Sequence, residues 1–295
     1  MSILLDENSR VVVQGLSGYQ AQFDTKFGLD YGTNILAGVV PGREGQTVLG
    51  LPIYNSVRQA VINHGVDTSA IYIPARAAKD AILEAIYAGI KLIVIVSEMI
   101  PLKDFAQVYR IAKSHDVRLI GPNCNGIISP GKAKILILGN DYRFFTPGPV
   151  GVLSRSGGMN HEVSNLLTLK GIGQSTCVSI GGDVMVGTTF REGLELFEED
   201  DQTKVVLMYC EPGGRMEEDA AQFIQEGRFS KPVVAFVVGE FMEKLPQGMP
   251  FGHAGAIIEG GVGKPSVKKK ILAAAGVHVA ERLNDIPDII KNLLN

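Results

Sequence analysis

A histidine near the end of the chain stands in a segment that suits a displayed nucleophile. His253 lies in the run FGHAGA, with Gly252 directly before it and Gly255 two residues after it. Glycine adopts positive φ and lets other groups approach the backbone closely, so the run predicts a loop that presents the imidazole. A neutral imidazole is a competent nucleophile near neutral pH. Taken alone, the run is explained more simply by a histidine hydrogen-bonded in an ordinary turn, and other segments must decide.

A second segment has the composition of a phosphate site. Ser154 opens the run SRSGG, which follows a predicted strand and precedes a predicted helix. Ser156, Gly157 and Gly158 would then offer backbone amides at the positive end of that helix. A plain N-cap explains the serines but leaves the paired glycines unexplained. Glu211 follows another predicted strand, where its carboxylate would orient an imidazole, although taken alone it is more simply explained by a solvated turn.

Two turns near the N-terminus have a similar character. Gly15 and Gly18 follow the first predicted strand, but Ala21 stands where a dinucleotide fingerprint would have its third glycine. The spacing disfavours a nicotinamide site and leaves open a phosphate-bearing ligand or a packing turn. Arg43 lies in the turn after the second strand, where its planar guanidinium would suit a terminal phosphate or serve as a solvated loop charge.

Short β-branched runs alternate with helical stretches along the whole chain, which predicts parallel, doubly wound α/β structure. Strands are predicted at 10–14, 34–40, 52–54, 70–73, 91–96 and 118–120, with helices at 19–31, 56–64, 77–88 and 102–115. Strands are predicted again at 150–153, 175–180, 204–209, 232–237 and 277–280, with helices at 159–169, 190–198, 216–225 and 266–275. Between these two series, proline and glycine residues interrupt the alternation of strands and helices. We therefore expect domains at 1–128 and 150–295, joined by a linker at 129–149.

Composition excludes several classes of function. The chain has 295 residues and a formal net charge of −3, so it lacks the basic field that nucleic acid or an anionic membrane attracts. Its three cysteines, Cys124, Cys177 and Cys210, lack metal-ligand spacing and suit a reducing compartment. The apolar runs are far shorter than a bilayer span, and no basic leader opens the chain. We expect a cytoplasmic protein with no metal site.

The ordered motifs together resemble one family. They include VVPG at 39–42, GLP at 50–52, GPNC at 121–124, SRSG at 154–157, GIGQSTC at 171–177, IGGD at 180–183 and GHAGAI at 252–257. This set, which spans essentially the whole chain, resembles the succinyl-CoA synthetase alpha-subunit family within the ADP- or GDP-forming acyl-CoA synthetases. The resemblance implies a Rossmann-like domain that binds coenzyme A (CoA), followed by a flavodoxin-like domain. It also implies a phosphohistidine at His253.

By matching position, the resemblance assigns roles to residues in both domains. Ser17, Gly18 and Gln20 would hold the CoA phosphates, Arg43 its 3′-phosphate, and Pro41, Tyr72, Pro74 and Glu98 the pantetheine and adenine neighbourhood. Glu211 would support His253, while the loop of Ser154, Ser156, Gly157 and Gly158 would receive the phosphoryl group. A partner beta subunit would supply the site for ATP or GTP with Mg²⁺.

Two departures from the family pattern concern the acid substrate. Asn125 stands where the family usually has proline, and the run SGGMNHE at 156–162 resembles ATP-citrate lyase and citryl-CoA synthetase. We expect the acid to contact Asn123, Asn125, Asn160 and His161, and to be a polar anion other than succinate, such as citrate, malate or a sulfonated carboxylate. A true succinate enzyme remains open. So does a non-enzymatic CoA-binding sensor, whereas a nicotinamide dehydrogenase is disfavoured by the missing glycine.

Overall fold

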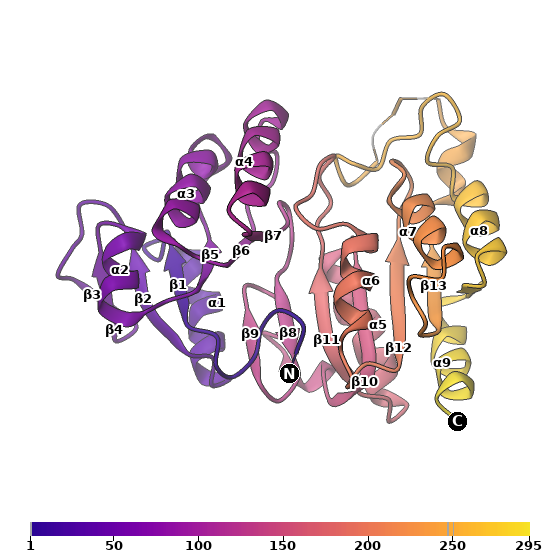
Figure 1. Ribbon diagram of the computed structural model, residues 1–295, viewed down its shortest axis with the longest axis horizontal. Helices are drawn as coiled ribbons and strands as arrows, with labels where there is room; N and C mark the ends of the chain where they lie inside the picture. Colours follow the sequence, from indigo (N-terminus) through magenta and orange to yellow (C-terminus); the bar gives the residue numbers. More distant parts are fainter. Residues whose placement is uncertain (1, 247, 250) are drawn as a thin grey trace.

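The computed structural model describes residues 2–246, 248–249 and 251–295, which form two α/β domains side by side (Figure 1). Each domain is built around a seven-stranded sheet. The sequence predicts this fold class correctly, and most of the predicted elements are present within one or two residues of their expected ends.

The first sheet has the strand order of a Rossmann fold. Its strands are β1 (Val11–Gln14), β2 (Ile35–Val39), β3 (Thr47–Val48), β4 (Leu51–Tyr54), β5 (Thr68–Ile71), β6 (Leu92–Ile95) and β7 (Arg118–Ile120). They lie in the order β3-β4-β2-β1-β5-β6-β7, and every pair except β3 with β4 is parallel. Without the β3 edge strand, the parallel strands follow the order 3-2-1-4-5-6. The direction of winding therefore reverses between β1 and β5.

Alternate side chains of this sheet enter two different cores. The helices are α1 (Tyr19–Asp30), α2 (Val57–His64), α3 (Ala75–Ala88) and α4 (Leu102–Ser114). Val12 packs in a cluster with side chains from α2, α3 and α4, whereas Val11 and Val13 pack with Ala21 of α1. This alternation follows from the two-residue period of a strand, and it places helices on both faces.

The second sheet contains a flavodoxin-like parallel core. Its strands are β8 (Ile127–Ser129), β9 (Ala133–Ile135), β10 (Pro147–Ser154), β11 (Gln174–Ser179), β12 (Val205–Cys210), β13 (Val233–Val237) and β14 (His278–Val279). They lie in the order β14-β13-β12-β10-β11-β8-β9. The five parallel strands, numbered along the chain, thus follow the order 2-1-3-4-5 with a switch point between β10 and β12.

Helices cover both faces of this sheet as well. They are α5 (Gly157–Leu169), α6 (Phe190–Glu198), α7 (Met216–Gln225), α8 (Pro265–Ala274) and α9 (Ile286–Leu294), with the 3₁₀ turns η1 (Tyr142–Phe144), η2 (Glu240–Lys244) and η3 (Leu283–Asp285). Val152 and Leu207 pack with side chains of α5 and α9, and Leu153 and Met208 pack with those of α6 and α7. The sequence does not predict α9, which lies beyond the last periodic segment recognised.

Residues 129–149 differ most from expectation. The sequence predicts a linker there, but these residues contain the end of β8, all of β9, η1 and the start of β10. The β8–β9 hairpin is antiparallel to β11 and extends the second sheet. It also contacts the first domain, because the Thr33 hydroxyl donates to the carbonyl of Lys134 at 2.8 Å and accepts from its amide at 2.9 Å. The pattern missed these strands because Pro130, Gly131 and Gly139 interrupt the apolar runs and indicate a loop.

Candidate active site

The switch point of the second sheet brings the predicted phosphate-transfer residues together. Ser154 ends β10, and Glu211 directly follows β12, its neighbour in the sheet. Clefts at the carboxyl ends of parallel strands form at such reversals, because the flanking connections run to opposite faces. His253 comes from a distant loop that folds over this edge.

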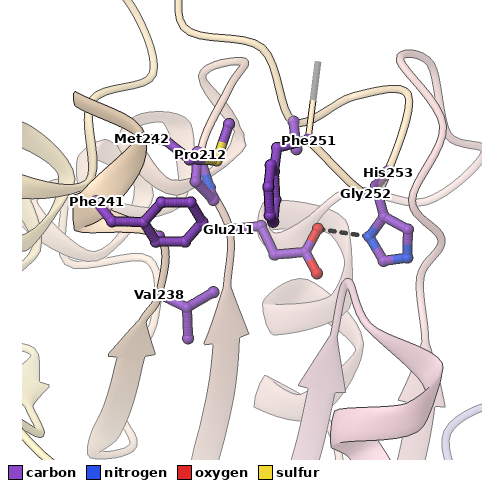
Figure 2. A pocket seen from close by; sticks show the side chains of 10 residues that line it. Glu211, Pro212, Val238, Phe241, Met242, Phe251, Gly252 and His253 are labelled. Carbon is purple, nitrogen blue, oxygen red and sulfur yellow. Dashed lines mark hydrogen bonds and ion pairs between the residues drawn. The ribbon is translucent and has the colours of Figure 1, made fainter. Parts of the chain in front are cut away.

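Glu211 and His253 make direct contact. Nδ1 of His253 lies 2.7 Å from Oε2 of Glu211, and the Glu211 side chain points toward the imidazole in Figure 2. Both line a cavity of about 230 Å³ whose far wall is formed by Phe241 and Phe251. The imidazole lies over Gly182, where a Cβ atom would be 2.5 Å from Cγ of His253. Only glycine at this position leaves room for the ring.

Hydrogen bonding favours one state of the imidazole. The bond from Glu211 raises the pKa of His253 above its ordinary value, against the lowering effect of burial. In the neutral ring, an Nδ1–H that donates to the carboxylate leaves the lone pair on Nε2. Among the described residues, no hydrogen bond engages Nε2. The arrangement therefore presents Nε2 as the nucleophile.

A buried ion pair fixes the loop that carries Glu211. The amide of Glu211 donates to Oε1 of Glu217 at 3.3 Å, and Glu217 pairs with Lys268, both side chains being fully buried. Gly213 has a φ of +88° and donates its amide to the carbonyl of Gly263 at 2.9 Å. These interactions fix the Glu211 loop, and the imidazole loop is held separately, by the amide of Gly255 donating to the carbonyl of Gly182 at 3.0 Å.

The predicted phosphate cradle is a helix N-terminus. Ser156 is the N-cap of α5 and accepts from the amide of Met159 at 3.3 Å, while Ser154 donates its hydroxyl to the carbonyl of Ser156 at 2.6 Å. Gly157 and Gly158 occupy the first turn, where backbone amides have no intrahelical acceptor. Such amides, at the positive end of a helix, suit an anionic oxygen.

One predicted acid contact lies beside this cradle, and another contacts the loop beneath His253. Asn125 packs so closely against Gly157 that a Cβ atom there would overlap its amide group. Asn123 donates its side-chain amide to Oδ1 of Asp183 at 3.1 Å, and the amide of Met99 donates to Oδ2 at 3.0 Å. Burial raises the pKa of Asp183 above its ordinary value. Asp183 therefore links the first domain to the loop beneath His253, a role that its sequence context did not reveal.

The structure does not bring the other two predicted contacts to the same place. Asn160 is fully buried and accepts from the hydroxyl of Ser164 at 3.4 Å. Nδ1 of His161 lies 3.0 Å from the carbonyl of Gly157, and Nε2 accepts from the amide of Gly139 at 3.4 Å. Burial lowers the pKa of His161 below its ordinary value. Both ring nitrogens of His161 are thus engaged by backbone groups. A substrate contact by His161 stays a prediction, and this geometry disfavours it.

The predicted CoA residues line one edge of the first sheet. They follow four strands that are neighbours in the order β2-β1-β5-β6. Pro41 and Arg43 follow β2, Ser17, Gly18 and Gln20 follow β1, Tyr72 and Pro74 follow β5, and Glu98 follows β6. Gly18 is the N-cap of α1 and has no side chain to accept from the first amides of that helix. These open amides lie at the same edge, because α1 follows β1. This edge includes the switch point between β1 and β5.

Two of these residues are hydrogen-bonded to a buried carboxylate. Tyr72 donates its hydroxyl to Asp24 at 3.0 Å, and the Gln20 amide lies 2.9 Å from both oxygens of the same group. Burial, followed by the charge of Asp24, raises the pKa of Tyr72 well above its ordinary value. Arg43 and Glu98 are exposed in the loops around them. The edge thus combines two anchored polar side chains with open loop positions.

Arg155 is a further residue whose importance the sequence did not indicate. It is only 1% exposed, and its Nη2 lies 3.5 Å from the carbonyl of Asp183. Its Nε atom is buried and has no hydrogen-bond partner among the described residues. A buried guanidinium with unused donors is costly unless an anion pairs with it. Its place between two serines gave no sign of this, since only the tertiary fold directs its side chain.

The described ranges contain neither a metal-binding cluster nor a membrane-spanning helix. No group of three or more histidine, cysteine, aspartate or glutamate side chains is arranged to hold a metal ion there. No helix in those ranges is both long and apolar enough to span a bilayer.

Sequence comparisons agree with this arrangement of domains. Residues 6–99 match the CoA binding domain family, and residues 153–278 match the CoA-ligase family. The chain is 49% identical over 294 residues to an ADP-forming succinate–CoA ligase subunit alpha 1 from Archaeoglobus fulgidus, covering 100% of this chain and 99% of that one. The chain belongs to the succinate–CoA ligase alpha-subunit family. The resemblance inferred from its motifs is confirmed, and the chain is an acid–thiol ligase subunit.

Other relatives extend the comparison. A succinate–CoA ligase alpha subunit from Staphylococcus epidermidis is 45% identical over 286 residues, which cover 97% of this chain and 93% of that one. An ATP citrate lyase from Methanosaeta concilii, solved with (3S)-citryl-CoA, superposes with a TM-score of 0.91 at 26% identity. That match covers 98% of this chain and 50% of the lyase chain. The succinate–CoA ligase alpha-subunit fold therefore corresponds to about half of the larger lyase.

Proposed function

We propose that this chain is the alpha subunit of a nucleoside-diphosphate-forming carboxylate–CoA ligase, and that His253 carries the phosphoryl group. The observation that supports this most strongly is the contact between Nδ1 of His253 and Glu211. It leaves the lone pair on Nε2 available for attack. A partner beta subunit would supply ATP or GTP with Mg²⁺, and the names of the relatives, which are ADP-forming and alpha subunits, support a partner and a nucleotide that leaves as the diphosphate.

The proposed reaction has three reversible steps. Nε2 of His253 attacks the γ-phosphorus of the nucleotide, and the bond to the β-phosphate oxygen breaks to release the diphosphate. A carboxylate oxygen of the acid then attacks that phosphorus, which breaks the N–P bond and restores the neutral imidazole. Finally the CoA thiolate attacks the acyl carbon of the acyl phosphate and inorganic phosphate leaves, with the thiol proton released to solvent. Each step exchanges one good leaving group for another.

The residues around His253 would assist the first two steps. The carboxylate of Glu211 offsets the positive charge that the ring gains when Nε2 forms its bond to phosphorus. The amides of Gly157 and Gly158 would stabilise the phosphoryl oxygens through fixed dipoles. The contact of Met99 with Asp183 brings the CoA-binding edge next to this loop, so the thiol would need to travel little.

The acid substrate is the finer part of the proposal. Asn125, packed against Gly157, adds a hydrogen-bonding group beside the cradle and supports a polar acid other than succinate, such as citrate, malate or a sulfonated carboxylate. Succinate is the second candidate, because the relatives at 45–49% identity are named for it. The names of these relatives do not support a departure from succinate, and the positions of Asn160 and His161 add nothing in its favour.

Labelling and a panel of acids would test both parts. The chain copurified with its partner should acquire label from γ-³²P-ATP or γ-³²P-GTP, and His253→Ala should reduce labelling to background. His278→Ala, which changes an exposed strand residue, should label normally. Normal labelling of His253→Ala would refute the phosphohistidine. Turnover that strongly favours succinate over citrate, malate and sulfoacetate would refute the departure from succinate.

A further inference from the structure

A buried carboxylate at the CoA edge is shared by the two domains. Asp24 lies on α1 and is 2% exposed. Its oxygens accept from Gln20 and Tyr72 of the first domain, and the side-chain amide of Asn140 donates to Oδ1 at 2.7 Å. Asn140 follows β9, a strand of the second sheet. Asp24 therefore joins two residues of the CoA edge to a loop of the second domain.

The loop that carries Asn140 is held by contacts within its own domain. Gly139 has a φ of +80°, and a Cβ atom there would lie 2.5 Å from Cδ1 of Ile128 in β8. The amide of Gly139 donates to Nε2 of His161 in α5 at 3.4 Å. These contacts fix the backbone next to Asn140, so its side chain reaches Asp24 from a set position.

The groups on either side determine how the Asn140 amide is oriented. Its Oδ1 accepts from the ammonium group of Lys134, whose side chain is fully buried. An ammonium group only donates and an ionised carboxylate only accepts, so one orientation of the amide serves both. Asn140 thus bridges a buried cation and the buried carboxylate of Asp24, each of which is costly without hydrogen bonds.

There is little room for solvent beside these groups. A cavity of about 10 Å³ is lined by Asp24, Tyr72 and Lys134 among others, which is about the space that one water molecule needs. Bulk solvent would therefore replace a lost hydrogen bond poorly. Without the Asn140 amide, the carboxylate would shift toward its remaining partners at the CoA edge and move them.

We propose that Asp24 and Asn140 are positioning residues that hold Gln20 and Tyr72 in place for CoA. The inference rests on the CoA contacts expected of Gln20 and Tyr72. Asp24 and these two residues lie within residues 6–99, which match the CoA binding domain family, whereas Asn140 lies outside that range. The second domain thus completes the CoA site of the first and sets its affinity.

Asn140→Ala in the copurified complex tests this arrangement. The Kd for CoA, measured by isothermal titration calorimetry, should rise about tenfold, as expected for one lost hydrogen bond to a charged group. The KM for CoA should rise in parallel, while kcat at saturating CoA and the labelling of His253 should keep their wild-type values. A residue that only stabilises the fold would not produce this split between KM and kcat.

A reversal of donor and acceptor provides a second variant. Asn140→Asp has nearly the same shape and still accepts from Lys134, but its carboxylate cannot donate to Asp24. It should also raise the Kd for CoA, and it decides the question if Asn140→Ala does not fold. In the double variant Asp24→Asn/Asn140→Asp the amide at position 24 donates instead, so this variant should recover part of the lost affinity.

Thr33→Val is the matched control. It removes the hydroxyl that contacts the backbone of Lys134 in the same hairpin, and it leaves the side chains of Asp24 and Asn140 in place. It should weaken the contact between the domains and change the Kd for CoA less than about twofold.

The outcomes separate this inference from the proposed function. A Kd of Asn140→Ala within about twofold of wild type would refute it, as would an equal rise in Thr33→Val, which would assign the effect to a general loosening of the domains. A double variant that binds CoA no better than Asn140→Asp would refute it too. A wild-type chain that binds no CoA would refute the CoA contacts themselves. A wild-type chain that binds CoA but does not label would refute the phosphohistidine alone.

Discussion

The carboxyl edges of the two sheets both lie at a switch point, but they differ in how deeply their polar side chains are buried. In the first sheet, the edge presents exposed loop residues such as Gly18 and Arg43 and the open amides of α1. In the second, it collects buried charged groups, among them Arg155 and Glu211. An exposed ion pair contributes little free energy, so the loss of one exposed charge has a small effect. A buried charge is destabilised strongly when its partner is removed. The first edge is therefore suited to holding a large ligand and the second to chemistry.

This difference predicts that substitutions at the two edges will have unequal effects. Loss of one buried partner at the second edge should impair the chemical step itself. Loss of one exposed contact at the first edge should weaken binding and leave the chemical step intact. The largest effect is expected where the imidazole meets its carboxylate.

Glu211→Gln should slow labelling of His253 by about 10- to 100-fold, because the amide cannot balance the charge on the ring. It should also change the pH dependence. Nε2 reacts only in the neutral ring, so wild-type labelling should fall as pH decreases through the raised pKa of His253. Without the carboxylate this acid limb should move to lower pH. Rates of labelling measured between pH 5.5 and 8.5 would show both changes.

The control for this experiment is Glu281→Gln, which alters a carboxylate whose side chain is 77% exposed. It should leave both the rate and the acid limb unchanged. If Glu211→Gln lost activity with its acid limb unmoved, Glu211 would serve the fold of the loop and not the ionisation of His253.

Arg43→Ser tests the other edge and should have a smaller effect. We expect the KM for CoA to rise about tenfold, since one charge-assisted contact to a phosphate would be lost. Labelling of His253, which needs no CoA, should be unaffected. Arg58→Ser removes another exposed arginine from α2 of the same domain and should change neither quantity. Equal KM values for the two variants would remove Arg43 from the CoA site.

The sequence predicts a site residue well where neighbouring residues determine its position, and poorly where the tertiary fold does. The contact of Glu211 with His253 was predictable from the family resemblance, whereas the turn that carries Glu211 was a weak signal on its own. His161 illustrates the limit. It is five residues after Ser156 in sequence, but the helical rotation directs its ring to Gly139 and the backbone of Gly157. Its neighbours in sequence therefore say little about where it points.

Buried charges were the least predictable part of the molecule. The run SRSGG suggests its serines and glycines as ligands, yet the fold buries Arg155 together with Ser154. Lys134 is also fully buried, in a short strand that nearby proline and glycine residues conceal from the periodic pattern. In both cases long-range contacts decide the environment of the side chain, and a single sequence carries no direct record of them.

Lys134 connects the β8–β9 hairpin of the second sheet to the CoA edge of the first, and this gives the smallest predicted effect. Its ammonium group contacts Oδ1 of Asn140, whose amide donates to Asp24 at 2.7 Å, and Asp24 in turn accepts from Tyr72 at the CoA edge. Burial lowers the pKa of Lys134 to about 7 from its ordinary 10.5, against the opposing charge of Asp24. The network thus places a titrating cation between the two regions.

The free energy of unfolding should therefore rise with pH from about 7 toward 10.5. In that window the unfolded chain keeps the Lys134 proton that the folded chain has released, so raising the pH favours the folded state. The slope from one proton is at most about 1.4 kcal/mol per pH unit. In Lys134→Met this contribution should vanish, whereas in Lys170→Met, which alters an exposed lysine, it should persist. Urea unfolding at pH 7, 8 and 9 would measure it. Parallel pH profiles for wild type and Lys134→Met would mean that Lys134 keeps one charge state throughout, and that the hairpin and the CoA edge are joined by a fixed ion rather than a titrating one.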